Sequence, residues 1–156
     1  MMRCPPFSYR APGTIAEAAE ILAAEGPAAT LLAGGTDLIP GMKRRTQEPR
    51  VLVSVRKVAG LRGICRDTDG TVVIGAGTTL AEIASSPTLR AFAALQQAAA
   101  QVATTHIRNV GTVGGNLCLD TRCNYYDQNL EWRQAIGYCK KREGETCWVA
   151  PGSPRC

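Results

Sequence analysis

Hydrophobic residues recur with a helical period near the start of the chain, before shorter apolar runs take over. The repeat comprises Ile15, Ala18, Ala19, Ile21 and Leu22. Thr14 and Glu17 have the spacing of a capping box, in which each side chain satisfies a free backbone N–H at the start of a helix. We therefore predict a helix that begins after Thr14 and ends near Gly26-Pro27.

Two short apolar runs have the length and composition of buried strands, namely Ala28 to Leu32 and Val51 to Val55. The stretch from Leu61 to Gly75 predicts a β-hairpin, because Asp69-Gly70 at its centre is a strong turn signal. The first run leads directly into a pair of glycines. Together these patterns predict an α/β unit over about residues 5 to 120.

The second half of this unit is predicted to be helical and the rest of the chain irregular. Thr79 with Glu82 is a second capping box and predicts a short helix. Ser86-Pro87 is typical of a helix start, and the following apolar pattern predicts a longer helix to about Val102. Beyond Thr104 the periodicity disappears, which predicts an irregular C-terminal appendage.

Composition places the chain among globular proteins, since 45% of its 156 residues are hydrophobic and 20% are charged. No apolar run is long enough to span a bilayer, and the N-terminus lacks the apolar stretch of a signal peptide. We therefore expect a cytoplasmic protein without membrane association. In that compartment its seven cysteines stay reduced, and an odd number excludes full pairing within one chain.

The formal charge of +5 does not by itself indicate nucleic-acid binding. Apart from Lys43-Arg44-Arg45 and Lys140-Lys141-Arg142, the basic residues are scattered and form no stripe with aromatic residues. A basic rim beside an anionic cofactor, or a docking face for a partner, explains the charge equally well. We expect no nucleic-acid partner.

Two glycine pairs are the strongest candidates for a binding site. The first lies in Leu31-Leu32-Ala33-Gly34-Gly35-Thr36-Asp37-Leu38 and the second in Thr112-Val113-Gly114-Gly115-Asn116. Adjacent glycines admit positive φ angles, and successive N–H groups in such a turn form a concave anion site. Two such turns can hold the two phosphates of a dinucleotide. An ordinary strand-to-helix turn is the alternative for either stretch taken alone.

The glycines do not follow the Rossmann pattern. Gly75-Ala76-Gly77 follows a predicted strand, but Leu80 occupies the third glycine position of G-x-G-x-x-G. His106, the one histidine, lies between the last predicted helix and the second glycine pair. We interpret it as a hydrogen-bonded loop residue near a bound dinucleotide, with a catalytic role as the alternative.

The C-terminal segment contains four cysteines, Cys123, Cys139, Cys147 and Cys156, spaced C-x15-C-x7-C-x8-C. Such a set in a reducing compartment indicates metal ligation more than disulfides. Zinc sites usually use tight C-x2-4-C pairs, whereas a [4Fe–4S] cluster accepts widely spaced thiolates from a wrapping loop. Spacing favours iron–sulfur, but zinc (including a site that uses Cys118 with Cys123), free thiols and disulfides stay open.

The stretches "LLAGGTDL" and "IRNVGTVGGN" resemble the two flavin-binding signatures of the FAD subunits and domains of molybdenum hydroxylases, over about residues 5 to 120. In that family both loops surround the FAD pyrophosphate and ribityl chain. The resemblance implies FAD contacts at Leu31 through Leu38, at Thr112 through Asn116, and near Val102. It implies no catalytic residue on this chain, because the redox chemistry belongs to the flavin.

The segment "NLCLDTRCNYYDQ…EWRQ…YCKK…CWVAPGSPRC" resembles the insertion in the FAD subunits of 4-hydroxybenzoyl-CoA reductases, which carries an additional [4Fe–4S] cluster. The resemblance implies Cys123, Cys139, Cys147 and Cys156 as its ligands, with Cys4, Cys65 and Cys118 as structural thiols. The surrounding aromatic residues would then shield the cluster from water. These are Tyr125, Tyr126, Trp132, Tyr138 and Trp148.

The resemblance predicts an α+β, two-lobed FAD-binding domain of the molybdenum-hydroxylase type over residues 1–120 and a cysteine-rich [4Fe–4S] loop over 121–156. It implies an oxidoreductase subunit that passes electrons from ferredoxin through the cluster and FAD to a molybdenum subunit. The reaction would be reductive dehydroxylation in anaerobic aromatic degradation. Expected partners are a molybdenum-cofactor subunit and a small [2Fe–2S] subunit in a hetero-oligomer, and we expect the chain to be part of a longer subunit.

Two alternatives remain beside that hypothesis. The first is the FAD subunit of another molybdenum hydroxylase, of the xanthine or carbon monoxide dehydrogenase type. The second is a structural zinc module that mediates interactions and binds no flavin.

Overall fold

The computed structural model describes residues Arg3 to Cys156, which form two compact units. Met1 and Met2, at the start of the predicted flavin region, lie outside the described residues. The glycine-loop unit comprises residues 7–37 and 49–119, and the cysteine unit comprises residues 3–6, 38–48 and 120–156. The boundary predicted near residue 120 stays a prediction, and the unit that holds residues 120–156 also holds the separate stretch 38–48.

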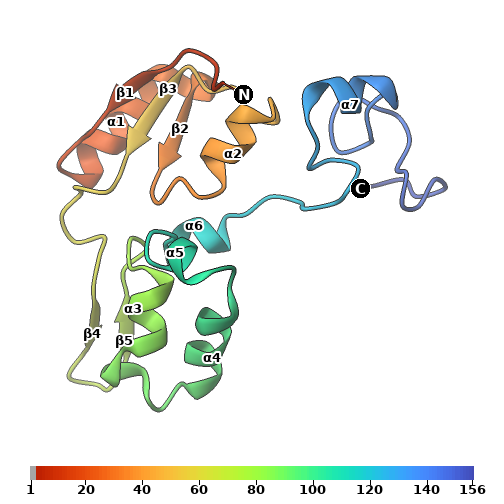
Figure 1. Ribbon diagram of the computed structural model, residues 1–156. Helices are drawn as coiled ribbons and strands as arrows, with labels where there is room; N and C mark the ends of the chain where they lie inside the picture. Colours follow the sequence, from red (N-terminus) through yellow and green to blue (C-terminus); the bar gives the residue numbers. More distant parts are fainter. Residues whose placement is uncertain (1–2) are drawn as a thin grey trace. The chain divides into compact units, whose positions relative to one another are not determined.

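One lobe of the glycine-loop unit is a three-stranded parallel sheet covered by a helix (Figure 1). Its elements are β1 (Ser8–Arg10), α1 (Ile15–Glu25), the 3-10 turn η1 (Gly26–Ala28), β2 (Ala29–Leu32) and β3 (Val51–Ser54). The strand order is β1-β3-β2, and Val51 pairs with both Ser8 and Ala29. Every residue of β3 is buried, as expected for a central parallel strand. Ala18 of α1 packs with Val51 and Val53 in the core of this lobe.

The helix predicted after Thr14 is confirmed with its cap. The Thr14 hydroxyl accepts a hydrogen bond from the Glu17 N–H at 3.1 Å, and the helix ends at Glu25 before Gly26. The Glu17 carboxylate accepts from the Gly13 N–H, one residue before the position that a full capping box would use. Strand β1 was not predicted.

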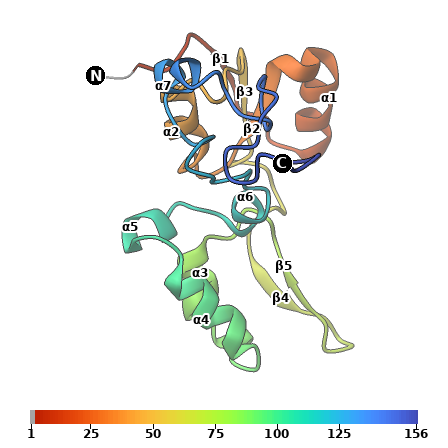
Figure 2. The same cartoon turned by 90° about the vertical axis from the view of Figure 1, so that its right-hand side faces the viewer.

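The other lobe packs short helices against a hairpin (Figure 2). Its elements are β4 (Ile64–Arg66), β5 (Val72–Ile74), α3 (Leu80–Ser85), the 3-10 turn η2 (Pro87–Leu89), α4 (Ala93–Gln101), α5 (Thr105–Arg108) and α6 (Val113–Leu117). The predicted hairpin and the capping box of Thr79 and Glu82 are both present. Leu80, Ile83, Leu89 and Ala99 form its core.

Two predictions for this region need correction. The long helix expected from Ser86-Pro87 to Val102 is broken into η2 and α4, because Leu89 turns into the core while Phe92 stays 46% exposed. The Gln96 side-chain amide donates to the carbonyls of Ile83, Ala84 and Ser86, which anchors α4 to the end of α3. Beyond Thr104 the chain is also less irregular than predicted, since threonine caps begin both α5 and α6.

The cysteine unit contains α2 (Leu38–Lys43) and α7 (Leu130–Ala135), joined to extended loops. Met42 of α2 is fully buried. Asn129 caps α7 by accepting from the Trp132 N–H at 2.9 Å. No helix between Arg3 and Cys156 has the length and apolar character required to cross a membrane.

Candidate functional site

The first glycine turn lies against Val110-Gly111, the two residues that directly precede the second glycine turn, within the glycine-loop unit. A Cβ atom built on Gly34 would lie 2.2 Å from the carbonyl oxygen of Val110 and 2.9 Å from its carbonyl carbon. A Cβ on Gly111 would lie 3.5 Å from the Thr36 hydroxyl. Only glycine permits this approach of two backbones. The structure therefore brings together the two stretches that the sequence singles out.

The first turn offers free hydrogen-bond donors. Gly35 has φ +72°, the left-handed conformation that turns the chain after β2. Within the part of the chain that the structure describes, the N–H groups of Gly34, Gly35 and Thr36 donate no hydrogen bond to the protein. All three residues are half-buried. Consecutive free N–H groups in a turn are a typical anion-binding arrangement.

The second turn differs, because its N–H groups already have partners. Val113 donates to the Thr78 carbonyl and Gly114 to the Ala76 carbonyl, each at 2.9 Å. Gly115 donates to the Thr112 hydroxyl at 3.2 Å, which caps α6. A ligand at this turn would meet side chains and the close backbone of the glycines in place of free N–H groups.

Gly75 and Gly77, which flank Ala76, allow close packing of the backbone against Leu61. Cβ atoms on Gly75 and Gly77 would lie 2.5 and 2.9 Å from the Leu61 carbonyl oxygen. Ala76 in turn lies against Gly114, where a Cβ would come within 2.8 Å of the Ala76 methyl group. Residues 75–77 therefore pack directly against Gly114 of the second glycine turn.

The remaining flavin-region candidates are less distinctive. Val102 packs against the hydrophobic core formed around Ile83, and its carbonyl accepts a hydrogen bond from Arg108 at 2.9 Å. His106 lies on α5 and is exposed. Neither position tests the predicted proximity to a cofactor.

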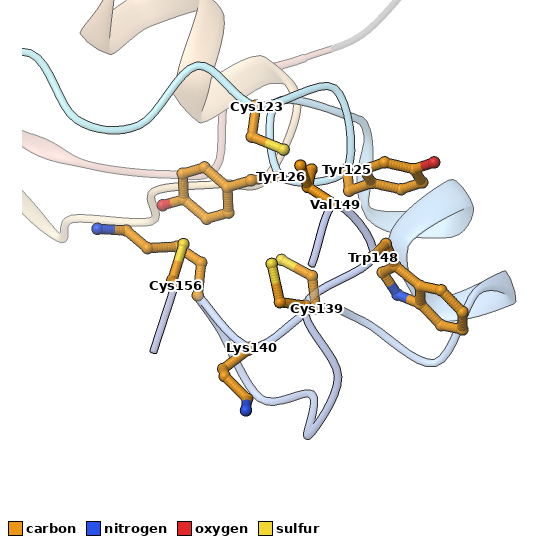
Figure 3. A pocket seen from close by; sticks show the side chains of 10 residues that line it. Cys123, Tyr125, Tyr126, Cys139, Lys140, Trp148, Val149 and Cys156 are labelled. Atoms are coloured by element: carbon orange, nitrogen blue, oxygen red, sulfur yellow. The ribbon is translucent and has the colours of Figure 1, made fainter. Parts of the chain in front are cut away.

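The four cysteines of the C-terminal segment line one pocket in the cysteine unit. The pocket encloses about 250 Å³ of empty space, part of it open to solvent. Its lining residues are Cys123, Cys139, Cys147, Cys156, Tyr125, Tyr126, Lys140, Lys141, Trp148 and Val149. Figure 3 shows the labelled sulfur atoms of Cys123, Cys139 and Cys156 facing a common space. All seven cysteines of the chain are free thiols.

Cys139 is the most enclosed of the four, with 7% of its surface exposed. Its carbonyl accepts hydrogen bonds from the N–H groups of Arg142 at 2.9 Å and Gly144 at 3.1 Å, so the chain folds back over it. The Trp148 indole donates to the Tyr138 carbonyl at 2.6 Å and ties the Cys147 segment to the same loop. Hydrogen bonds to backbone carbonyls thus hold the segments of Cys139 and Cys147 together.

The predicted aromatic shield is partly present. Tyr126 is 8% exposed and lines the pocket. Trp148 also lines it but is 43% exposed. Trp132 packs on Tyr125, with ring centroids 6.2 Å apart, and does not line the pocket.

An ion pair lies at the pocket wall. The Lys141 ammonium is 2.7 Å from the Asp120 carboxylate, and the Tyr126 hydroxyl donates to the other Asp120 oxygen at 3.3 Å. The hydrogen bond from Lys141 holds the pKa of Asp120 below its usual range. Burial, followed by the negative charge of Asp120, raises the pKa of Tyr126. Tyr126 therefore stays a neutral hydrogen-bond donor at neutral pH.

Two arginines fasten the stretch 38–48 to the rest of the cysteine unit. Arg133 is 2% exposed and donates to the carbonyls of Arg45 at 2.6 Å and Gln128 at 3.3 Å. Arg142 donates to the Thr46 carbonyl. Arg44 adds an ion pair with Asp127 at 2.7 Å.

Replacing Arg133 with methionine is expected to lower the free energy of unfolding of the cysteine unit by about 2–4 kcal/mol, because two carbonyls lose a charged donor. Urea unfolding followed by tryptophan fluorescence measures this, since both tryptophans of the chain, Trp132 and Trp148, lie in that unit. Arg155→Met is the control and should cost less than about 0.5 kcal/mol at an exposed position. Equal losses of unfolding free energy in the two variants would contradict the proposed role of Arg133 in holding the cysteine unit together.

Sequence reasoning missed three kinds of residue in these sites. Val110 contributes the carbonyl that contacts Gly34, and its only signal is the neighbouring Gly111. Asp120 binds two residues that line the pocket, Lys141 and Tyr126, but carries no motif. The contacts of Arg45 and Thr46 with the C-terminal segment are separated by 88 and 96 residues and leave no local pattern.

Known proteins are similar to this chain over the glycine-loop unit, and in part over the cysteine segment. Residues 5–130 match the family model for the FAD binding domain in molybdopterin dehydrogenase. The chain is 42% identical over 114 residues to the carbon monoxide dehydrogenase medium chain of Hydrogenophaga pseudoflava, covering 72% of this chain and 39% of the relative. It is 42% identical over 112 residues to the xanthine dehydrogenase FAD-binding subunit of Escherichia coli O157:H7, covering 71% and 38%.

One relative extends across the cysteine segment. The aldehyde oxidoreductase FAD-binding subunit PaoB of Escherichia coli K12 is 35% identical over 152 residues, covering 96% of this chain and 45% of the relative. The solved structure of carbon monoxide dehydrogenase from Hydrogenophaga pseudoflava superposes with a TM-score of 0.72 at 41% identity, covering 74% of this chain and 40% of that one. The chain thus spans less than half the length of these relatives.

Proposed function

The chain belongs to the family of FAD-binding domains in molybdopterin dehydrogenases, and from this membership we propose that it forms part of a flavin-carrying, electron-transfer subunit of a molybdenum hydroxylase. Its fold is the FAD-binding domain of the molybdenum-hydroxylase type, with the two lobes described above. The named relatives are subunits of dehydrogenases and oxidoreductases. The close approach of Gly34 to Val110-Gly111, directly before the second glycine turn, is the observation that carries the proposal.

The first glycine turn would hold the FAD pyrophosphate. Its three free N–H groups, from Gly34, Gly35 and Thr36, match the oxygens of a phosphate, and Thr36 adds a hydroxyl. The second turn, from Thr112 to Asn116, would approach the ribityl chain with the Asn116 side chain and the bare Gly115 backbone. When bound, FAD supplies the electron transfer, so this chain needs only to bind and orient it. Leu31 to Leu38 and Val102 are the other proposed contacts.

The cysteine pocket would hold a [4Fe–4S] cluster. Its four free thiols number one for each iron, and Lys140 and Lys141 offset the negative charge of four thiolates. A single zinc needs sulfurs about 3.8 Å apart, given Zn–S bonds of about 2.3 Å. Among residues 3–156, no group of three or more cysteine, histidine or carboxylate side chains is close enough to hold one metal ion. The proposal of a cluster rests instead on the four thiols that line one pocket.

The carbon monoxide, xanthine or aldehyde oxidising type is favoured over 4-hydroxybenzoyl-CoA reductase. The relative that spans the cysteine segment is an aldehyde oxidoreductase subunit, so this segment does not point to the reductase alone. The reductase, with ferredoxin as electron donor, remains the second candidate because of the spacing of the four cysteines. In either case we propose a cytoplasmic hetero-oligomer with a molybdenum-cofactor subunit and a [2Fe–2S] subunit.

Purifying the full-length subunit anaerobically with its partner subunits tests this proposal. The flavin released by acid should be FAD, at about one per chain, and its identity follows from chromatography and fluorescence. A complex without flavin, or with FMN, would contradict the flavin assignment. Reduction of a dye acceptor by aldehydes, xanthine or carbon monoxide supports the first type. Consumption of 4-hydroxybenzoyl-CoA with reduced ferredoxin, and no dye reduction, would establish the second candidate.

A further inference from the structure

The ion pair of Lys141 and Asp120 is fixed in place beside the four thiols. Lys141, Tyr126 and all four cysteines line the same pocket. The Lys141 ammonium lies 2.7 Å from Asp120 and 6.0 Å from the centroid of the Tyr126 ring. Tyr126 also donates to Asp120 at 3.3 Å. Two side chains, Asp120 and Tyr126, thus restrain the positive charge of Lys141 at the pocket wall.

We propose that Lys141 is a positioning residue that sets the reduction potential of the cluster held by this pocket, and that Asp120 acts in the opposite direction. This inference rests on the proposed [4Fe–4S] site. Reduction adds one electron to the cluster and so one negative charge, while no bond is formed or broken. A fixed positive charge stabilises the more negative, reduced form, and nearby charge is one of the known determinants of cluster potentials. The carboxylate of Asp120 destabilises the same form.

The neighbouring lysine differs in its placement. The Lys140 ammonium donates to the Ser153 carbonyl at 2.6 Å, and Figure 3 shows it pointing away from the labelled sulfur atoms. Lys140 therefore has the same charge on the same loop, but its ammonium is bound to a backbone carbonyl and points away from the labelled sulfur atoms. It provides a matched control for Lys141.

The test uses the full-length subunit in its complex, titrated with a chemical reductant and redox mediators while the signal of the reduced cluster is followed by electron paramagnetic resonance. Lys141→Gln should lower the ratio of reduced to oxidised cluster about tenfold at a given potential, which equals about 59 mV for one electron. Asp120→Asn should raise this ratio. Lys140→Gln should shift it by less than about half as much, and Lys141→Arg should leave it nearly unchanged. The shift should shrink in high salt, because both groups are partly exposed.

The signs of the potential shifts in Lys141→Gln and Asp120→Asn distinguish an electrostatic effect on the cluster from a structural disturbance of the loop. Both Lys141→Gln and Asp120→Asn break the same ion pair, so mere disruption of the loop would move the potential in one direction. Opposite shifts at unchanged iron content support the proposal, whereas equal or absent shifts overturn it. If Lys141→Gln fails to load iron, the sign of the Asp120→Asn shift decides. A wild-type complex without iron and sulfide would instead refute the cluster assignment itself.

Discussion

Replacing Gly34 with alanine is expected to strip the flavin from the full-length subunit and to lower its free energy of unfolding by about 2–4 kcal/mol. The new methyl group would lie 2.2 Å from the Val110 carbonyl oxygen and 3.1 Å from the Gly111 Cα. These are backbone atoms, so no side-chain rotation relieves the clash. The two turns must separate, which moves the free N–H groups of the first turn. The ratio of flavin to protein and urea unfolding measure the two effects.

Gly60 provides the matched control for that substitution. It has φ +78°, and a Cβ atom there would meet nothing within 4 Å. Gly60→Ala should therefore cost only about 1 kcal/mol of backbone strain and keep the flavin. If Gly34→Ala retained flavin at the wild-type ratio, the turns would not form the binding site.

Replacing Cys139 with serine is expected to reduce iron and acid-labile sulfide from about four per chain to below about one. Cys139 is the most buried of the four thiols, and the loop folds back over it, so loss of this thiolate removes the most enclosed of the proposed ligands. Loss of the cluster should also destabilise the cysteine unit, because a bound metal group contributes to folding. Iron and sulfide analysis of anaerobically purified complex provides the measurement.

Serine variants of two other cysteines control for the loss of any thiol, as opposed to the loss of a cluster ligand. Cys65 lies exposed on β4 in the glycine-loop unit, and Cys65→Ser should keep full iron and sulfide. Cys118→Ser should also keep them, although a zinc site that used Cys118 with Cys123 would lose its metal. Stoichiometric zinc without sulfide in the wild-type complex is the outcome that would refute an iron–sulfur site.

Elements with local signals could be predicted from the sequence, and elements that depend on distant partners could not. The helix after Thr14 and the hairpin at Asp69-Gly70 carry their caps and turns within a few residues. Strand β1 is three exposed residues long, and only pairing with β3, more than 40 residues later, makes it a strand. The short helices α5, α6 and α7 are less than two turns long, so no hydrophobic period could reveal them.

The candidate sites followed the same division. Glycine pairs and cysteine spacing are visible in the sequence, and the structure brings the two turns together and places the four thiols around one pocket. The sequence could not predict that the N–H groups are free in the first turn and paired in the second. The pairing depends on hydrogen bonds from Val113 and Gly114 to the carbonyls of Thr78 and Ala76. The arrangement of Lys141 with Asp120 was equally hidden, since a charged pair 21 residues apart has no sequence signature.

The arginine contacts also bear on how the cysteine segment could be inherited or transplanted. Residues 120–156 do not form a self-contained cassette, because Arg133 and Arg142 bind carbonyls of Arg45 and Thr46. A flavin subunit that acquired only the C-terminal stretch would receive the buried Arg133 guanidinium without its Arg45 acceptor, and the exposed Arg142 without its Thr46 acceptor. Because both acceptors are main-chain carbonyls, a chimaera needs the backbone path of residues 38–48 beside the C-terminal stretch, but no particular side chain at positions 45 and 46.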